Sequence, residues 1–379
     1  MRFPGFEGEW EECCNEDFGK VVTGNTPPTA ETRFYENGYK LWASPADLGG
    51  DKYISSTQTK LTEEGFSKTR IVPNGATLVT CIGSTIGKMG MATQEMSTNQ
   101  QINTVIPNEL TDRQYLYYAI QSQFPRYVKS IAVQAVPIIS KGSFEKLKNY
   151  RPHIDEQKKI GSFLNLLDCR ISIQNKVIED LKKLKAALCV SLYDESEPNY
   201  LIGDIIEQIS TRNRKGESLT VLSVSNQQGF VEQSEQFEGR TIASQDTSNY
   251  KIVSIDDFAY NPARINVGSI ARLTSFEKGI VSPMYICFRC NNEILPGYLE
   301  SFFETDYFFL EMEKRLEGSV RMCLSYEGLC NIPIAIPTLQ KQKNVERKIQ
   351  VLKDKIRLEE SIHKQLSIQK QYILSQLFI

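Results

Sequence analysis

The sequence predicts an α+β protein in which two globular segments are each followed by one long helix. One helix entrance occurs twice, because Pro152–Ile160 reads PHIDEQKKI and Pro337–Val345 reads PTLQKQKNV, 185 positions further on (337 − 152). A heptad pattern of apolar residues follows each copy, and short apolar runs broken by Gly, Pro and Asn precede it. A repeat of this length indicates a duplicated module.

The repeat divides the chain into four parts. We expect a first globular domain at residues 1–151, a central helix at 152–196, a second globular domain at 197–336 and a C-terminal helix at 337–379. Within the globular parts, IVPNG at Ile71 pairs with IVSID at Ile252, and IGKMG at Ile86 pairs with VGSIA at Val267, both at an offset of 181 (252 − 71). These runs predict strands. A helical piece at 113–129 has a counterpart at 296–316.

The two long helices carry the clearest periodicity. Alternate steps of four and three from Ile160 to Leu192 meet apolar residues at eight of ten positions, and the same positions shifted by 185 run from Val345 to Leu377. Such a seam predicts that the helices pack on each other as a coiled coil. They would be antiparallel, because the first ends where the second globular segment begins, and the modules would be related by an approximate two-fold axis. The alternative is an ordinary helical hairpin inside one core, which the duplicated flanking segments disfavour.

Composition excludes several classes of protein. The net charge is only −2, so any basic surface must be local. The nine cysteines lack the spacing of a disulfide framework, which favours a cytoplasmic protein with free thiols. No apolar run is long enough to cross a membrane, and MRFPGFEGEW lacks the pattern of a signal peptide. We therefore expect no membrane partner.

No pattern of catalytic residues is convincing. The only histidines are His153, before a helix, and His363, on the heptad seam, so neither a Ser-His-Asp nor a Cys-His arrangement is expected. GSTIGK at Gly83–Lys88 has three residues between its glycines where a phosphate loop has four. It is better explained as a glycine-kinked hairpin that leaves Lys88 free to meet a phosphate.

Two further motifs fail in the same way. NPAR at Asn261–Arg264 partly matches the Asn-Pro-Pro-aromatic motif of adenine methyltransferases, but Ala263 and Arg264 depart from it and no glycine-rich cofactor loop precedes it. A turn presenting Arg264 is the better interpretation. A zinc site would have to be assembled from thiolates whose spacing is poor, namely Cys287, Cys290, Cys323 and Cys330. We expect no metal and no cofactor.

Several segments resemble one known family. They are RFPGFEGEW at the N-terminus, VTGNTP at Val22–Pro27, IGSTIGKMG at Ile82–Gly90, and ISKGSFEKLKNYRPHIDEQKKIGSFLNLLD with its copy LSYEGLCNIPIAIPTLQKQKNV. Through them nearly the whole chain resembles the specificity subunit of type I restriction–modification systems. Two departures concern the second half, which has Gln340-Lys341 in place of Asp155-Glu156 and lacks the FPGF-W opening.

The resemblance implies a non-enzymatic DNA-binding subunit. Each globular segment would be a target-recognition domain that reads one half of a bipartite site on double-stranded DNA. The helices would act as a spacer and dock two methylation subunits, and restriction subunits would join the full complex. Because the modules differ in sequence, the site would be asymmetric. The alternatives are a scaffold whose helices assemble other proteins, and a chain with its own methyltransferase site, for which no cofactor loop is found.

Candidate DNA contacts are polar and basic residues in predicted loops. Arg and Lys position phosphates or read guanine, and Asn and Gln can read adenine, whereas any one of these residues could instead be an ordinary solvated side chain. The densest basic run is TRNRKG at Thr211–Gly216. The candidates are Thr23, Asn25, Lys68, Arg70, Lys88, Asn99 and Gln100 in the first module, and Arg212, Asn213, Arg214, Lys215, Arg240, Arg264 and Asn266 in the second.

Overall fold

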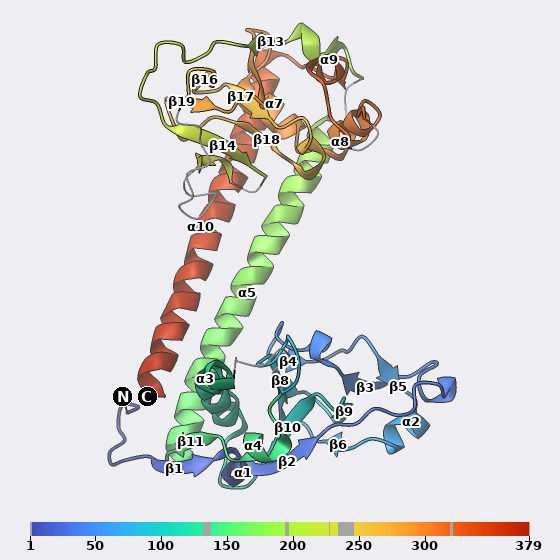
Figure 1. Cartoon of the computed structure of the whole chain (residues 1–379), viewed down its shortest axis with the longest axis vertical. Helices are drawn as coiled ribbons and strands as arrows, with labels where there is room; N and C mark the ends of the chain where they lie inside the picture. Colours follow the sequence, from blue (N-terminus) through green and yellow to red (C-terminus); the bar gives the residue numbers. More distant parts are fainter. Residues whose placement is uncertain are drawn as a thin grey trace. The chain divides into compact units, whose positions relative to one another are not determined.

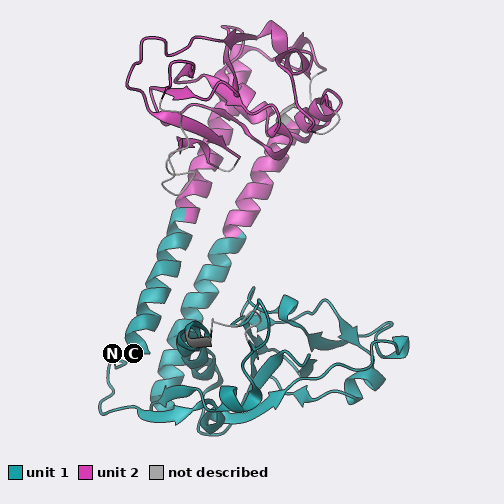
Figure 2. Cartoon of the chain, in the orientation of Figure 1, with its two compact units in different colours: residues 1–176, 361–379 teal, residues 177–360 magenta. Residues whose placement is uncertain are grey.

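The computed structural model describes residues 2–131, 138–193, 197–226, 228–233, 246–318 and 321–378. It divides into two compact units, residues 1–176 with 361–379 and residues 177–360 (Figure 2). Two long helices, α5 (Ile154–Tyr193) and α10 (Leu339–Leu377), contribute one part to each unit. The described helices include none that is long and apolar enough to cross a membrane.

Before α5 begins, unit 1 is built from short strands, short helices and one longer helix, α3 (Figure 1). In chain order they are β1 (Glu11–Cys14), α1 (Asn15–Phe18), β2 (Gly19–Thr23), η1 (Thr32–Phe34), β3 (Lys40–Ala43), η2 (Pro45–Asp47), β4 (Tyr53–Ile54), β5 (Lys60–Leu61), α2 (Glu63–Ser67), β6 (Ile71–Val72), β7 (Thr77–Thr80), β8 (Met89–Ala92), β9 (Met96–Thr98), β10 (Ile102–Pro107), α3 (Arg113–Ile131), α4 (Lys141–Glu145) and β11 (Lys148–Arg151).

Unit 2 repeats this plan between α5 and α10. Its elements are β12 (Tyr200–Leu201), η3 (Ile202–Asp204), β13 (Ile206–Ile209), β14 (Val221–Ser225), β15 (Gly229–Glu232), β16 (Lys251–Ser254), β17 (Phe258–Tyr260), η4 (Ile265–Val267), β18 (Ile270–Arg272), β19 (Lys278–Val281), β20 (Ile286–Cys290), α7 (Pro296–Phe302), α8 (Asp306–Glu313), α9 (Tyr326–Cys330) and β21 (Pro333–Ile334).

The sheets of the two units have the same topology, except that unit 1 adds the edge strand β4. In unit 1 the order β2-β10-β7-β8-β4 corresponds to β13-β20-β17-β18 in unit 2, and β5-β3-β9-β6 corresponds to β15-β14-β19-β16. In the second sheet the central pair is parallel in both units, and its flanking pairs are antiparallel. The small sheets β1-β11 and β12-β21 also correspond. The repeated strands predicted near Ile71 and Ile252 are thus confirmed as β6 and β16, and the sequence repeat is a repeat of the fold.

Each core is formed where a helix covers the first sheet. In unit 1, Tyr115 and Tyr118 of α3 are fully buried with Phe18 and Phe144. In unit 2 the single helix expected at 296–316 is divided into α7 and α8. The break occurs because the Thr305 side chain caps a new helix, its Oγ1 accepting a hydrogen bond from the backbone N–H of Phe308 at 3.2 Å.

The two long helices pack against each other inside each unit. In unit 1 the beginning of α5 (Ile160, Leu164) shares a core with the end of α10 (Leu377). In unit 2 the end of α5 (Leu188) lies against the beginning of α10 (Ile349). The predicted antiparallel pairing is therefore confirmed within both units. It depends on the heptad seam, which keeps one apolar face of each helix toward its neighbour.

A buried glutamine fixes each long helix to its globular part. Gln157 Nε2 donates to the carbonyls of Leu110 (3.0 Å) and Pro152 (2.9 Å), and its Oε1 accepts from the N–H of Asp112 (3.0 Å). Gln342, at the equivalent position of α10, makes the same three bonds to Glu293, Pro337 and Leu295 at 3.0, 3.0 and 2.8 Å. Both side chains are buried. The glutamine of the repeated entrance is thus a hydrogen-bonding clamp, because each buried peptide group needs a partner.

Replacing the clamp should destabilise one unit selectively. Gln157→Leu orphans three buried peptide groups, so we expect the free energy of unfolding of unit 1 to fall by about 2–4 kcal/mol. Both tryptophans, Trp10 and Trp42, lie in unit 1, so urea unfolding followed by tryptophan fluorescence reports on that unit. Gln342→Leu is the matched control and should leave this transition nearly unchanged. Equal shifts for both variants would show that the clamps do not act locally.

A half-buried lysine, Lys52, joins the globular part of unit 1 to both long helices. Lys52 Nζ donates to Tyr118 Oη (2.9 Å) and Asn165 Oδ1 (3.0 Å), and Tyr118 Oη donates to Asp168 Oδ2 (2.5 Å). Asp168 in turn pairs with Lys370 of α10 at 2.5 Å. Burial lowers the pKa of Lys52 to about 8, against the opposing attraction of Asp168.

This lowered pKa makes the stability of unit 1 depend on pH with a definite sign. In the unfolded chain the pKa of this lysine is about 10.5. Between pH 8 and 10.5 the unfolded chain therefore binds more protons than the folded chain, and the cost of burying Lys52 falls as the pH rises. Relative to Lys52→Met, we expect the free energy of unfolding of the parent chain to rise by about 2 kcal/mol from pH 7.5 to 10. Urea titrations at both pH values measure it, and parallel pH profiles would contradict it.

Candidate nucleic-acid interface

Six of the seven candidates in unit 1 are brought together by three loops. The loop after β2 meets the loop after α2, because Asn25 Nδ2 donates to the carbonyl of Lys68 at 2.9 Å and Asn25 Oδ1 accepts from the N–H of Arg70 at 2.8 Å. The loop after β9 joins them through the Oγ1 of Thr26, which donates to Gln100 Oε1 at 2.5 Å. The surface made by these loops is called loop surface 1.

Only part of loop surface 1 is free to contact a ligand. Thr23 Oγ1 donates to Asn103 Oδ1 (2.6 Å), and Asn99 is buried and exchanges hydrogen bonds with Gln101. These side chains and that of Asn25 shape the loops. Lys68, Arg70 and Gln100 are exposed, although Arg70 Nη1 also donates to the carbonyl of Thr23 at 2.7 Å. The exposed set combines two cations with an amide.

Lys88 lies apart from loop surface 1. Its stem packs over Gly49, and both residues line a hollow of about 640 Å³ with Tyr117 and Phe124 of α3. None of the described residues that line this hollow is one of the other six candidates. The hairpin expected at Gly83–Lys88 is present between β7 and β8, which pair antiparallel, and Gly83 and Gly87 have φ values of +94° and +92° that favour glycine.

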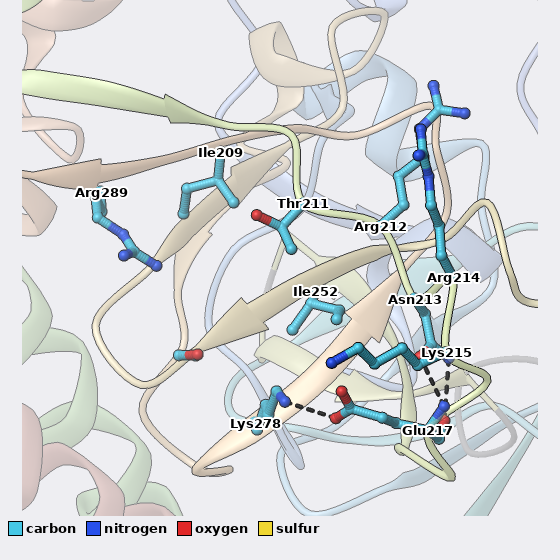
Figure 3. A pocket seen from close by; sticks show the side chains of 11 residues that line it. Ile209, Thr211, Arg212, Asn213, Arg214, Lys215, Glu217, Ile252, Lys278 and Arg289 are labelled. Atoms are coloured by element: carbon cyan, nitrogen blue, oxygen red, sulfur yellow. Dashed lines mark hydrogen bonds and ion pairs between the residues drawn. The ribbon is translucent and has the colours of Figure 1, made fainter.

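The basic run of unit 2 forms one wall of a pocket. This run follows β13, the strand equivalent to β2, and therefore occupies the same place in the fold as the first loop of loop surface 1. The pocket measures about 370 Å³ and is called loop surface 2 (Figure 3). Its lining residues are Ile209, Thr211, Arg212, Asn213, Arg214, Lys215, Glu217, Ile252, Ser254, Lys278 and Arg289.

Asn213 holds the turn that presents the cations. Its Nδ2 donates to the carbonyl of Glu217 (3.0 Å), its Oδ1 accepts from the N–H of Glu217 (2.8 Å), and the residue is buried. The candidate Asn213 thus has its amide engaged inside the protein. Arg212, Arg214 and Lys215 are exposed. In Figure 3 the two arginines extend away from the turn, and Lys215 reaches across the pocket toward Ile252.

Two cations of loop surface 2 were not predicted from the sequence. Lys278 pairs with Glu217 at 2.7 Å, and Arg289 makes a two-point contact with Asp257 at 3.1 and 3.0 Å while its side chain stays 51% exposed. The hydrogen bond from Lys278 holds the pKa of Glu217 below its ordinary value. Lys278 reaches the pocket because β19 pairs with β16, and Arg289 because β20 pairs with β13, so no local pattern marks them. Five cations face two carboxylates, which leaves an excess of three positive charges.

The remaining candidates of unit 2 lie outside this pocket. Arg264 and Asn266 are exposed on the turn around η4, which Asn261 stabilises by accepting from the N–H of Ala263 at 3.1 Å. Gly268, at φ +85°, ends that turn. NPAR therefore forms a structural turn that presents Arg264, as expected. Arg240 lies outside the described residues.

Cys287 and Cys290 offer no thiolate near neutral pH. Burial raises the pKa of Cys287 and of Cys290 to about 12, so both stay protonated near neutral pH. Over the part of the chain that the structure describes, no group of three or more His, Cys, Asp or Glu residues could hold a metal ion. Both loop surfaces offer exposed cations, and loop surface 1 adds the exposed amide of Gln100. Cations suit phosphates, and an amide suits a base edge.

Comparison with known proteins points to one family. Residues 7–183 match the model of the type I restriction modification DNA specificity domain. The chain is 29% identical over 196 residues to the type I restriction enzyme MjaIX specificity subunit of Methanocaldococcus jannaschii, covering 50% of this chain and 45% of that one. It is 29% identical over 185 residues to the EcoR124I/EcoR124II specificity subunit of Escherichia coli, covering 47% and 45%. Each match spans less than half of the relative.

Solved structures extend the likeness to the whole fold. The type-I restriction-modification system S subunit from M. genitalium superposes with a TM-score of 0.65 at 15% identity, covering 100% of this chain and 99% of that one. A chain from a study of complex assembly and conformational transition of the type I R-M system gives 0.57 at 13% identity, covering 98% and 97%. The predicted α+β fold with two sheet-rich units and two long helices is thereby confirmed.

Proposed function

We propose, from the match of residues 7–183 to the type I restriction modification DNA specificity domain, that the whole chain is the DNA-recognition subunit of a type I restriction–modification complex. Unit 1 would read one half of a bipartite site and unit 2 the other. The long helices would set the spacing and dock two methylation subunits, and restriction subunits would complete the assembly. The chain itself would perform no catalysis and hold no cofactor.

The observation that carries this proposal is the repeat of the fold together with the position of the cations. Unit 2 repeats the sheets of unit 1 except for the edge strand β4, and both units expose cations on loops beside these sheets. In unit 1 they are Lys68 and Arg70 after α2, and in unit 2 they are Arg212, Arg214 and Lys215 after β13. Two modules with the same architecture and different loop residues suit an asymmetric site with two different halves. The excess positive charge of loop surface 2 suits a phosphate backbone. Neither feature favours a protein-assembling scaffold.

The proposal is tested by the methylation pattern of a host that expresses the chain. The chain is expressed with the methylation subunit encoded beside it in a strain without other methylases, and modified adenines are mapped by long-read sequencing. We expect methylation at one asymmetric sequence with two defined halves and an unread spacer, which disappears when the chain is omitted. Methylation that persists without the chain, or none with it, would refute the proposal.

A further inference from the structure

The beginning of α5 in unit 1 is covered by the N-terminal segment of the chain. Arg2 Nη2 pairs with Glu156 Oε2 at 2.9 Å, and the N–H of Phe3 donates to Glu156 Oε1 at 3.2 Å. The Phe3 ring meets Phe163 edge to face at 6.0 Å. Glu156 and Phe163 are seven residues apart and lie on one face of the helix. An arginine and an aromatic ring thus occupy this face.

The equivalent face of α10 in unit 2 is lined differently. The described residues that line it are Leu188 of α5 and residues of α10 itself, and they include no aromatic side chain. A groove of about 520 Å³ is present there, between the end of α5 and α10. It is lined by Leu188, Asn344, Arg347, Lys348, Val351 and Leu352.

The residues at this face have changed charge between the two copies. With the offset of 185, Glu156 corresponds to Lys341, Ser162 to Arg347 and Phe163 to Lys348. The apolar neighbours are kept, since Leu166 (68% exposed) corresponds to Val351 (61% exposed). The same face therefore presents a buried carboxylate and a phenyl ring in unit 1, and exposed cations beside an exposed aliphatic side chain in unit 2.

Two cations line the groove, Arg347 and Lys348, and two more, Lys341 and Lys343, precede them on α10. All four are exposed, and within the described ranges none of them has a hydrogen bond or ion pair through its side chain. Four unpaired cations in the first turns of a helix also add to the positive potential of the helix N-terminus. The complement of this surface is a segment that carries carboxylates next to an apolar or aromatic side chain.

We propose that the groove of unit 2 binds an acidic segment with an adjacent apolar or aromatic residue, supplied by one of the two methylation subunits. In this contact the helix supplies the cations and the partner supplies the carboxylates. In unit 1 the charges are the other way round, because Arg2 of the N-terminal segment pairs with Glu156 of the helix while Phe3 packs on Phe163. This inference rests on the proposed function and deepens it. The two docking sites on the helices then differ in chemistry, and one methylation subunit is held by a charge-dependent contact that the other lacks.

The number of methylation subunits per chain tests this inference. The complex is purified and its mass is measured by light scattering at about 0.1 M and 0.5 M NaCl, since salt shortens the range of exposed charge interactions. For the parent chain we expect two methylation subunits at low salt and one at high salt. The variant Arg347→Ser with Lys348→Phe carries the residues of unit 1 at these positions and lacks both cations. We expect it to bind one methylation subunit at low salt, because the acidic contact is lost.

Charge reversal gives the sharper comparison. Arg347→Glu with Lys348→Glu should weaken binding of one methylation subunit at least tenfold and leave one per chain at low salt. The control, Arg357→Glu with Lys364→Glu, changes the same charges on exposed positions of α10 outside the groove and should retain two. The inference would be overturned if the groove variant still bound two methylation subunits. It would also be overturned if the parent chain lost both subunits together at high salt. No methylation subunit bound to any variant at low salt would overturn the proposed function itself.

Discussion

Replacing Arg212, Arg214 and Lys215 with alanine is expected to weaken binding of the complex to its DNA site by about 100-fold at ~0.15 M salt. Each cation that neutralises a phosphate releases a counterion, and three such contacts at about fivefold each give this loss. The slope of log affinity against log salt should become shallower by about 3. Asn213 is left in place because it holds the turn. Fluorescence anisotropy with a labelled duplex at several salt concentrations measures both quantities.

The loss should be confined to one half of the site. Scrambling either half of the site should weaken binding of the DNA to the parent complex. In the triple variant, scrambling the half that unit 2 reads should cost less affinity than it costs the parent, whereas scrambling the other half should cost the same. A control with the same charge change, Lys355, Arg357 and Lys364 to alanine, alters exposed positions on α10 instead. It should keep the affinity within a few-fold. An equal loss in variant and control would mean that general electrostatics, and not loop surface 2, binds the DNA.

A heptad inserted into each long helix is expected to lengthen the unread spacer of the site by about three base pairs. Lys182 of α5 and Glu360 of α10 pair at 2.9 Å, so seven residues added after each keep the helices in register and their apolar seam in phase. Seven residues add about 10.5 Å of helix, which corresponds to roughly three base pairs. The two half-sequences should stay the same, because neither loop surface is changed.

The methylation pattern of a host carrying this variant measures the spacer directly. An insertion after Lys182 alone is the control, and it should abolish methylation because the two helices then lose their register. A variant that methylates new half-sequences at the old spacing would contradict the division between reading modules and a spacing element.

The helices and the repeat were predictable from the sequence because they depend on the order of residues within one stretch of the chain. The central helix expected at 152–196 is α5, Ile154–Tyr193, and the C-terminal helix expected at 337–379 is α10, Leu339–Leu377. Each helix begins two residues after its expected start, and residues 194–196 and 379 lie outside the described residues. Apolar residues at heptad spacing identify such helices without knowledge of their neighbours. The division of 296–316 into α7 and α8 was not predicted, because a threonine inside a helical pattern becomes a cap only when the chain turns there.

The candidate site was predictable only in part, for the same reason. Arg212, Arg214 and Lys215 are consecutive or nearly so, and a polar turn after a strand is visible in the sequence. Lys278 and Arg289 come from other strands and reach loop surface 2 through sheet pairing. The sequence likewise does not show that the amides of Asn99 and Asn213 are engaged within the protein.

By itself the sequence determined that the chain contains one module twice, that two helices share a seam, and that Glu156 and Phe163 are replaced by Lys341 and Lys348 in the second copy. The tertiary structure decided what the replacement means. It shows the first copy covered by Arg2 and Phe3 and the second copy open as a groove. Periodicity is a local property of the chain, whereas cover and exposure depend on which distant segments the packed sheets and helices bring together.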